Sequence, residues 1–209
     1  MNKFDYAILL ATRKEAERYA IEKRVPIVSQ EGAALLSQIV SIRRPQRILE
    51  IGTAIGYSAM VIAASMPVGA SIVTIEQDPD RFSVAENFLT KAGLLSQVQM
   101  CCGDARQIIP DVSGPFDLVF FDAAKGQYPD YLAAVRDKLS SEAVIIADNI
   151  LFRGLVEEQG SIPRRYRTIV KRLREYLNLV NDQRCFHTDI HRGGDGIAVS
   201  YYQGRANHV

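Results

Sequence analysis

The sequence predicts an α/β fold built on an open, mostly parallel sheet with helices on both faces. Between residues 47 and 148, short segments rich in valine and isoleucine alternate with segments of helical length, an alternation typical of repeated β–α units. Two further strands, 184–190 and 196–202, flank the turn sequence HRGGDG and predict an antiparallel hairpin at one edge. We therefore expect a mostly parallel seven-stranded sheet with an antiparallel C-terminal hairpin.

The chain begins with helices. Residues 3–24 are predicted as a charged amphipathic helix, VPIVSQ as a connector and residues 31–42 as a second helix. Apolar segments then predict the first five strands, at 47–52, 70–76, 97–103, 117–122 and 143–148.

Capping and stop signals place the helices between these strands. Asp78 is a predicted N-cap followed by proline at the first helical position, and Gly93 ends that helix near residue 92. Asp104 and Gln107 resemble the capping box of a short helix. The remaining helices are predicted at 57–66, 129–139 and 163–179.

The composition is that of a single-domain globular protein. The chain has 209 residues, 47% hydrophobic and 23% charged, so we expect one domain with N-terminal helices over 1–44 and a core over 45–209. The net charge of +1 means that a polyanionic partner needs a local basic patch. Three cysteines without a C-x-x-C pair argue against a disulfide framework or a zinc site and favour the cytoplasm. No segment predicts a membrane span or a signal peptide.

Polar side chains follow consecutive strands, where parallel sheets bind their ligands. EIGTAIGYS comes after the first strand, Glu76 ends the second, and Asp104, Asp122 and Asp148-Asn149 follow the next three. A carboxylate such as Glu76 can accept from both hydroxyls of a ribose, and Asp104 can accept from an exocyclic amine. The glycine turn fits neither G-x-G-x-x-G nor a P-loop and alone is as often structural, but polar ends on successive strands indicate a ligand site.

These segments together resemble a known enzyme family. LEIGTAIGYS, Glu76, GDA, FFDAAKGQY and ADN are similar to the class I S-adenosylmethionine-dependent O-methyltransferases, in particular to the cation-dependent group of catechol and caffeoyl-CoA O-methyltransferases, over roughly residues 25–200. The resemblance implies a Rossmann-like methyltransferase fold. It also implies that Glu76 holds the cofactor ribose, that Asp104 and Ala105 meet the adenine, and that the methionine part is surrounded by Val28, Glu50, Gly52, Thr53, Gly56, Tyr57 and Ser58.

Asp122, Asp148 and Asn149 are the predicted metal ligands. Three oxygen donors without histidine or cysteine suit Mg²⁺, Mn²⁺ or Ca²⁺ rather than zinc, and the resembled family uses these three positions for its metal. Asp122 is also predicted to bind the cofactor and to take part in catalysis. Lys125 is the candidate base that takes the proton of the acceptor hydroxyl. Taken singly, Asp122 could also be an N-cap, Asp148-Asn149 a turn, and Lys125 a solvated loop lysine.

A basic stretch between Arg164 and Arg174 helps to choose among possible methyl acceptors. A compound with two neighbouring oxygens can chelate a bound cation, so a catechol or 5-hydroxyuridine would serve as the methyl acceptor. VPIV, EIGTAIGYSA, DAAKGQY and DNILFRGLV are similar to the bacterial branch that methylates 5-hydroxyuridine at the tRNA wobble position. This implies that loop 150–163 borders the substrate and that a basic helix binds the anticodon stem-loop. The predicted RNA-binding residues are Arg153, Arg164, Arg165, Arg167, Lys171 and Arg172.

Several residues fit a structural role as well as a functional one. The basic stretch can be a solvated helix face or a dimer contact, and a homodimer is expected. Tyr128 and Phe152 are candidates for stacking on the base or for the core. His187, Asp189 and His191 are more simply an edge strand than a metal site, and Asp195 a hairpin turn. A small catechol-like phenol is the alternative substrate.

Overall fold

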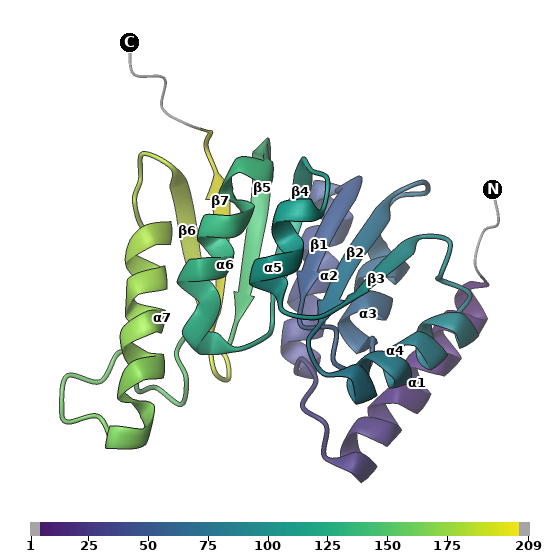
Figure 1. Ribbon diagram of the computed structural model, residues 1–209, viewed down its shortest axis with the longest axis horizontal. Coiled ribbons are helices and arrows are strands. Elements are labelled where there is room, and N and C mark those ends of the chain that lie inside the picture. The colour runs from purple at the N-terminus through teal and green to yellow at the C-terminus, as the bar shows by residue number, and fades with distance from the viewer. Residues whose placement is uncertain (1–4, 205–209) are drawn as a thin grey trace.

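A seven-stranded sheet forms the centre of the computed structural model, which describes residues 5–204 (Figure 1). The strand order is β3-β2-β1-β4-β5-β7-β6. All pairings are parallel except those of β7 with β5 and β6, as the sequence predicts. The strands are β1 (Arg47–Ile51), β2 (Ser71–Glu76), β3 (Val98–Cys102), β4 (Phe116–Phe121), β5 (Leu139–Asp148), β6 (Phe186–His191) and β7 (Ile197–Tyr202).

Helices cover both faces of the sheet (Figure 1). Four of them pack on one face, and three pack on the other. The first set is α1 (Tyr6–Lys23), α2 (Gln30–Arg43), α3 (Tyr57–Ser65) and α4 (Pro79–Lys91). The second set is α5 (Ala105–Ile108), α6 (Tyr128–Val135) and α7 (Arg167–Val180). None of the helices within residues 5–204 combines the length and apolar character of a membrane span.

The core consists of two layers separated by the sheet. Ile48 and Leu118 point into the layer of α1 to α4, whereas their neighbours Leu49 and Val119 point into the layer of α5 to α7. Successive strand residues face opposite sides of a sheet, so a strand buried on both faces is apolar throughout. This explains the continuous valine- and isoleucine-rich segments of the sequence.

Most predicted boundaries agree with the structure within a few residues. Helix α1 begins after Asp5, whose carboxylate accepts from the Ala7 amide at 2.8 Å; residues 3 and 4 of the predicted helix lie outside the described residues. Asp78 caps α4 and Asp104 caps α5, each accepting from backbone amides. The predicted helix 163–179 is found as a 3₁₀ turn, Arg164–Tyr166, followed by α7.

The prediction of a helix over 129–139 is wrong at its end. Helix α6 stops at Val135, and after a 3₁₀ turn the strand β5 begins at Leu139. Leu139 pairs with Phe116 of β4, and a shift in register lets Leu118 pair with Val144. The longer strand therefore depends on a pairing distant in sequence, which the local helical pattern does not contain.

Candidate active site

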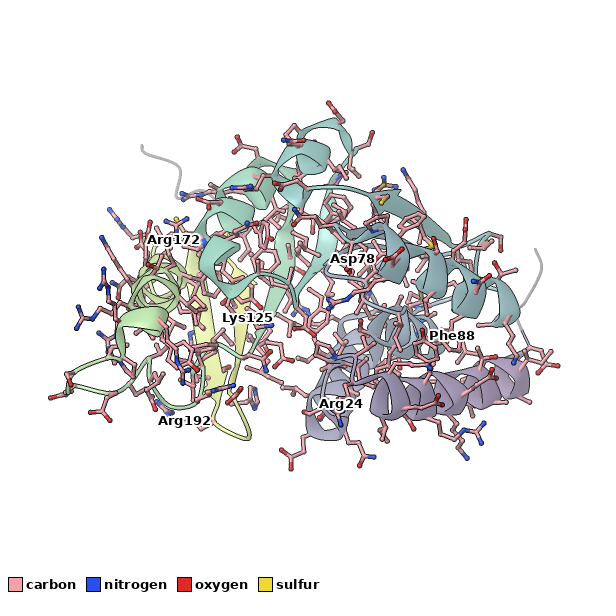
Figure 2. All side chains as sticks on the ribbon, turned by 60° about the horizontal axis from the view of Figure 1, so that its bottom comes forward. Arg24, Asp78, Phe88, Lys125, Arg172 and Arg192 are labelled. Carbon is pink, nitrogen blue, oxygen red and sulfur yellow. The ribbon has the colours of Figure 1, made fainter. Side chains whose placement is uncertain are left out.

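The carboxyl ends of β1, β2, β4 and β5 meet at one edge of the sheet, where a pocket of about 710 Å³ opens. Strands β1 and β4 are neighbours although β2 and β3 lie between them in sequence, so this is the switch point at which such sheets bind ligands. Figure 2 looks toward this edge and shows Lys125 near its middle, between Arg172 and Asp78. Of the predicted cofactor residues, Gly52, Glu76, Ala105 and Asp122 line the pocket.

Gly52 brings the turn after β1 against the end of β4. Its φ is +102°, and a Cβ built on it would lie 2.2 Å from the carbonyl oxygen of Asp122. No side chain fits there, and the conformation itself favours glycine. The glycine after the first strand thus permits a close backbone approach between two walls of the pocket.

Glu76 organises the rim of the pocket. Its carboxylate accepts from the amide of Ala54 at 2.7 Å and from the amide of Asp78 at 2.9 Å. These bonds join the turn after β1 to the start of α4. Carboxylate oxygens have more than one acceptor site each, so capacity for a ribose hydroxyl remains.

Glu50 is a fully buried acid behind the pocket. The Thr74 hydroxyl donates to its Oε2 at 2.5 Å, whereas Oε1 has no hydrogen-bond partner within the described chain. Burial raises the pKa of Glu50 from 4.5 to about 7, and the hydroxyls of Ser58 and Thr74 oppose this shift. An unsatisfied buried carboxylate oxygen is costly, and a cationic ligand group would satisfy it.

The remaining predicted cofactor residues do not line the pocket. Tyr57 donates its hydroxyl to Glu17 of α1 at 2.8 Å, and the Thr53 hydroxyl lies 2.5 Å from that of Thr74. Asp104 caps α5 and pairs with Arg106 at 2.5 Å, and this partner lowers the pKa of Asp104. Val28, Gly56 and Ser58 are buried among the elements around the pocket.

The predicted catalytic and metal residues come together. Lys125 Nζ donates to Asp122 Oδ1 at 2.7 Å, and both side chains are 19% exposed. Phe121 pairs with Ala147, which brings Asp122 level with Asp148 at the ends of β4 and β5. Asp148 Oδ1 accepts from the Asn149 amide at 2.7 Å. Asn149 adopts φ +56°, which asparagine tolerates, and lines the pocket.

The surroundings of Asp148 shift the pKa of its carboxyl group. Burial, followed by the charge of Asp122, raises the pKa of Asp148 to about 6, while the amide of Asn149 and the charge of Lys125 oppose the shift. The buried Asp148 thus lies near an ion pair, that of Lys125 with the half-buried Asp122. Residues 5–204 contain no group of three or more His, Cys, Asp and Glu arranged to hold a metal, so the H-x-D-x-H sequence does not form such a group.

Tyr128 belongs to the core. It is fully buried, and its hydroxyl donates to the carbonyl oxygens of Phe121 at 3.1 Å and Asp148 at 2.9 Å. It therefore cannot stack on a base. Its hydrogen bonds join the ends of β4 and β5, which carry the two aspartates. Phe152 is half-buried and packs edge-on against Tyr166, 5.4 Å between ring centroids.

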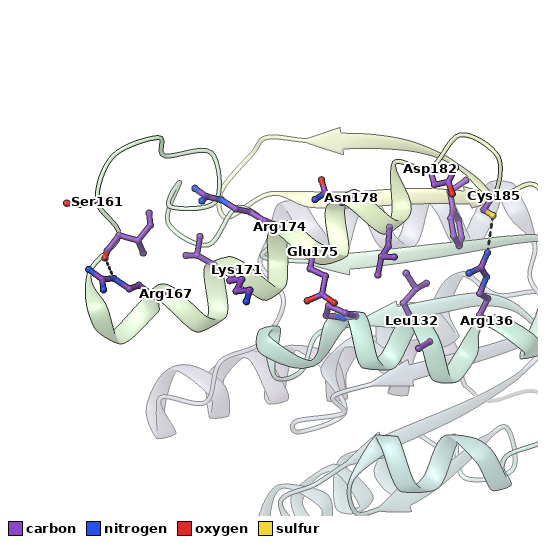
Figure 3. A pocket seen from close by; sticks show the side chains of 16 residues that line it. Leu132, Arg136, Ser161, Arg167, Lys171, Arg174, Glu175, Asn178, Asp182 and Cys185 are labelled. Carbon is purple, nitrogen blue, oxygen red and sulfur yellow. Dashed lines mark hydrogen bonds between the residues drawn. The ribbon is translucent and has the colours of Figure 1, made fainter.

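The predicted RNA-binding residues lie on α7 and the turns before it. Arg164 and Lys171 are exposed, and Arg165 lies over the Tyr166 ring at 4.5 Å. The others have protein partners: Arg153 donates to Tyr166, Arg167 to the carbonyl of Ile162, and Arg172 to Asp130, Glu175 and Gly126. Figure 3 shows Arg167 and Lys171 along a groove of about 1000 Å³ between α7 and α6.

Sequence reasoning missed several residues that line the pocket. Pro26 and Ile27 reach it from the connector after α1, and Tyr131 reaches it from α6. The Tyr131 hydroxyl donates to Gln127 at 2.7 Å. None of them follows a strand of the parallel core, so the search of strand ends had no signal for them.

A mostly parallel sheet of this order, with a pocket and paired acids at its switch point, is typical of Rossmann-like methyltransferases. The family model described as O-methyltransferase matches residues 5–201, and the chain belongs to this family. This confirms the predicted enzyme class, an S-adenosylmethionine-dependent O-methyltransferase.

Individual relatives agree with this assignment. A catechol O-methyltransferase of Niastella koreensis is 34% identical over 161 residues, 75% of this chain and 72% of that protein. A catechol O-methyltransferase of Mycobacterium tuberculosis is 30% identical over 194 residues, 91% and 87% of the two chains. The O-methyltransferase TomG of Streptomyces achromogenes, solved in complex with SAM, has a TM-score of 0.83 at 27% identity and covers 92% of this chain and 90% of its own.

Proposed function

We propose that this enzyme uses S-adenosylmethionine and a divalent cation to methylate the 5-hydroxyl of 5-hydroxyuridine at the tRNA wobble position. One observation carries cation-dependent methyl transfer: Asp122, Lys125, Asp148 and Asn149 meet at the edge of the pocket at the switch point. The unsatisfied Oε1 of Glu50 supports a cofactor with an ammonium group, because that group could donate to it.

The donor set of this edge fits a hard divalent cation. Asp122, Asp148 and Asn149 would hold it through two carboxylates and one amide oxygen, the ligands that Mg²⁺ and Ca²⁺ prefer. Three protein ligands leave positions for water and acceptor oxygens. When bound, such a cation supplies a Lewis acid that lowers the pKa of a hydroxyl.

The chain's own residues then orient the reactants and handle the proton. The acceptor oxygen bonds to the methyl carbon as the carbon–sulfur bond breaks, and S-adenosylhomocysteine leaves. Lys125 is placed to take the hydroxyl proton, because its Nζ lies at this edge, 2.7 Å from Asp122. Holding donor and acceptor in contact accounts for much of the acceleration expected of such a site.

The basic surface of α7 supports an RNA acceptor. Arg172 of α7 donates to the carbonyl oxygen of Gly126 at 3.0 Å, beside Lys125, so RNA bound along α7 would end next to the catalytic lysine. Arg164 and Lys171 offer exposed charges for phosphates. A wobble base already lies in a loop, which lowers the cost of presenting it. The cytoplasmic location and the homodimer remain predictions.

A small catechol-like phenol is the second candidate, favoured by the names of the two relatives above. The two substrates separate in one assay: methyl transfer from S-adenosylmethionine to an anticodon stem-loop carrying 5-hydroxyuridine, and to catechol, each with Mg²⁺ or with chelator. We expect Mg²⁺-dependent transfer to the RNA. Rapid methylation of catechol without methylation of the RNA would establish the small phenol as the substrate. Full activity in chelator would show that the reaction needs no divalent cation.

The basic surface has its own test. We expect Arg164→Glu combined with Arg165→Glu to weaken binding of the stem-loop at least about tenfold, because two phosphate contacts become repulsions, while cofactor affinity stays unchanged. The control is Lys14→Glu with Arg18→Glu, the same charge change on exposed residues of α1, at the other end of the molecule (Figure 1). Equal RNA affinity in both double variants would eliminate the basic turn before α7 as an RNA surface.

In cells, the proposal predicts the modification state of tRNA. Deleting the gene should leave 5-hydroxyuridine in place of 5-methoxyuridine at the wobble position, measured by mass spectrometry of tRNA nucleosides. Unchanged 5-methoxyuridine would assign that reaction to another enzyme.

A further inference from the structure

A second cavity, of about 500 Å³, meets the predicted metal ligands from the direction of α2 and the β6–β7 turn. It is lined by Asp148 and Asn149, and Asn149 also lines the pocket at the switch point. Its volume lies within the range of small-ligand sites. A methyl acceptor must reach both the cation and the cofactor, and a cavity that shares Asn149 with the cofactor pocket lies beside both predicted sites.

The β6–β7 turn is a fixed wall of this cavity. The amide of Leu151 donates to the carbonyl oxygen of Asp195 at 2.8 Å, and the amide of Arg153 donates to Asp195 Oδ1 at 3.0 Å. Gly196 has φ +77°, and a Cβ on it would lie 2.4 Å from Leu151 Cγ. The turn is therefore held against the segment that follows Asn149, and its glycine permits the close approach.

Glu31 provides an acceptor on the opposite wall. It lies in the first turn of α2 and lines the cavity, and its carboxylate is exposed with no hydrogen bond or ion pair within residues 5–204. Its Oε2 is 3.2 Å from the position that a Cβ on Gly193 would take. The carboxylate thus reaches from α2 to the β6–β7 turn, in the cavity that Asp148 and Asn149 also line.

We propose that this cavity holds the acceptor ring and that Glu31 determines its specificity by accepting a hydrogen bond from a ring N–H. The inference rests on the proposed function. In 5-hydroxyuracil the 5-oxygen and the 4-carbonyl oxygen are the chelating pair, and N3–H adjoins the carbonyl carbon. A catechol offers the same pair of oxygens but no N–H. Glu31 therefore selects a pyrimidine over a catechol, and recognition of the N–H is separate from recognition of RNA by α7.

The test uses two stem-loop RNAs that differ only at N3 of the target base, one carrying 5-hydroxyuridine and the other its N3-methyl derivative. With wild-type protein and Mg²⁺, we expect kcat/KM to be about 10- to 100-fold higher for the N–H form, the effect of losing one hydrogen bond to a charged group. Glu31→Ala should reduce this preference to within about threefold. Glu31→Gln should retain part of it, because the amide oxygen still accepts.

Gln30→Ala is the matched control, since Gln30 is the neighbouring exposed residue of α2 and does not line the cavity; it should keep the full preference. A folded Glu31→Ala enzyme with the wild-type preference, or a wild-type enzyme with none, overturns the role of Glu31 while transfer to RNA, and with it the proposed function, stands. A wild-type enzyme that methylates neither RNA overturns the proposed function and the role of Glu31 together.

Discussion

The buried carboxyl group of Glu50 should make the stability of the ligand-free protein fall as pH rises. Its side chain is fully buried, and burial raises its pKa from 4.5 to about 7. The folded state therefore holds this proton more tightly than the unfolded chain does. The resulting stabilisation is fully present below pH 4.5 and is lost as pH rises through 7, because the carboxylate must then ionise inside the core.

The perturbation is Glu50→Gln, which keeps an acceptor for the Thr74 hydroxyl and removes the ionisation. One pKa unit corresponds to about 1.4 kcal/mol. A shift from 4.5 to about 7 then corresponds to roughly 3 kcal/mol over the full range. Between pH 5 and pH 8 we expect the free energy of unfolding of the variant to rise by about 2 to 3 kcal/mol relative to wild type.

Urea unfolding at pH 5, 6, 7 and 8, in chelator and without cofactor, measures this difference. Other titrating groups, such as Asp148 with its pKa raised to about 6, affect both proteins and cancel. Glu142→Gln is the control, an exposed acid on β5, and its difference from wild type should not depend on pH. A Glu50→Gln difference constant within about 0.5 kcal/mol would refute the reasoning.

The same substitution should weaken the binding of the cofactor. If Oε1 of Glu50 accepts from the ammonium group of S-adenosylmethionine, losing the charge should raise the dissociation constant about 10- to 100-fold. Isothermal titration calorimetry at pH 8 measures it. A variant that is more stable and binds the cofactor more weakly would mark Glu50 as a site where stability is lost for the sake of binding.

Three further substitutions test the other groups of this edge. Asp148→Ala should abolish methyl transfer and weaken Mg²⁺ binding in calorimetry, because it removes one of three oxygen ligands; retained Mg²⁺ affinity would contradict that role. Lys125→Met should lower kcat at least about 100-fold, since the proton acceptor is lost together with the ion pair to Asp122; a wild-type kcat would exclude Lys125 as the base. Tyr128→Phe should destabilise the protein by about 1–3 kcal/mol in urea unfolding, because two buried carbonyl oxygens, those of Phe121 and Asp148, lose their donor; a loss below about 0.5 kcal/mol would show that these bonds contribute little to stability.

Local patterns in the sequence were enough for most of the fold. Glycine, proline and N-cap signals placed α4 within one residue, because capping depends on neighbours in the chain. The boundary between α6 and β5 was not predictable in this way, because Leu139 becomes a strand residue only through its pairing with Phe116.

For the site, the sequence by itself determined which polar groups stand at the strand ends, because parallel strands place their carboxyl ends at one edge. That Asp122 and Asp148 are neighbours there depends on the pairing of β4 with β5. Only the tertiary structure decided what each group does there. Burial raised the pKa of Glu50 and placed Tyr128 in the core, and an ion pair joined Arg172 to Asp130. Glu31 of α2 and the β6–β7 turn came to line one cavity. These outcomes depend on long-range packing, because burial and charge pairing are properties of the three-dimensional neighbourhood and not of spacing along the chain.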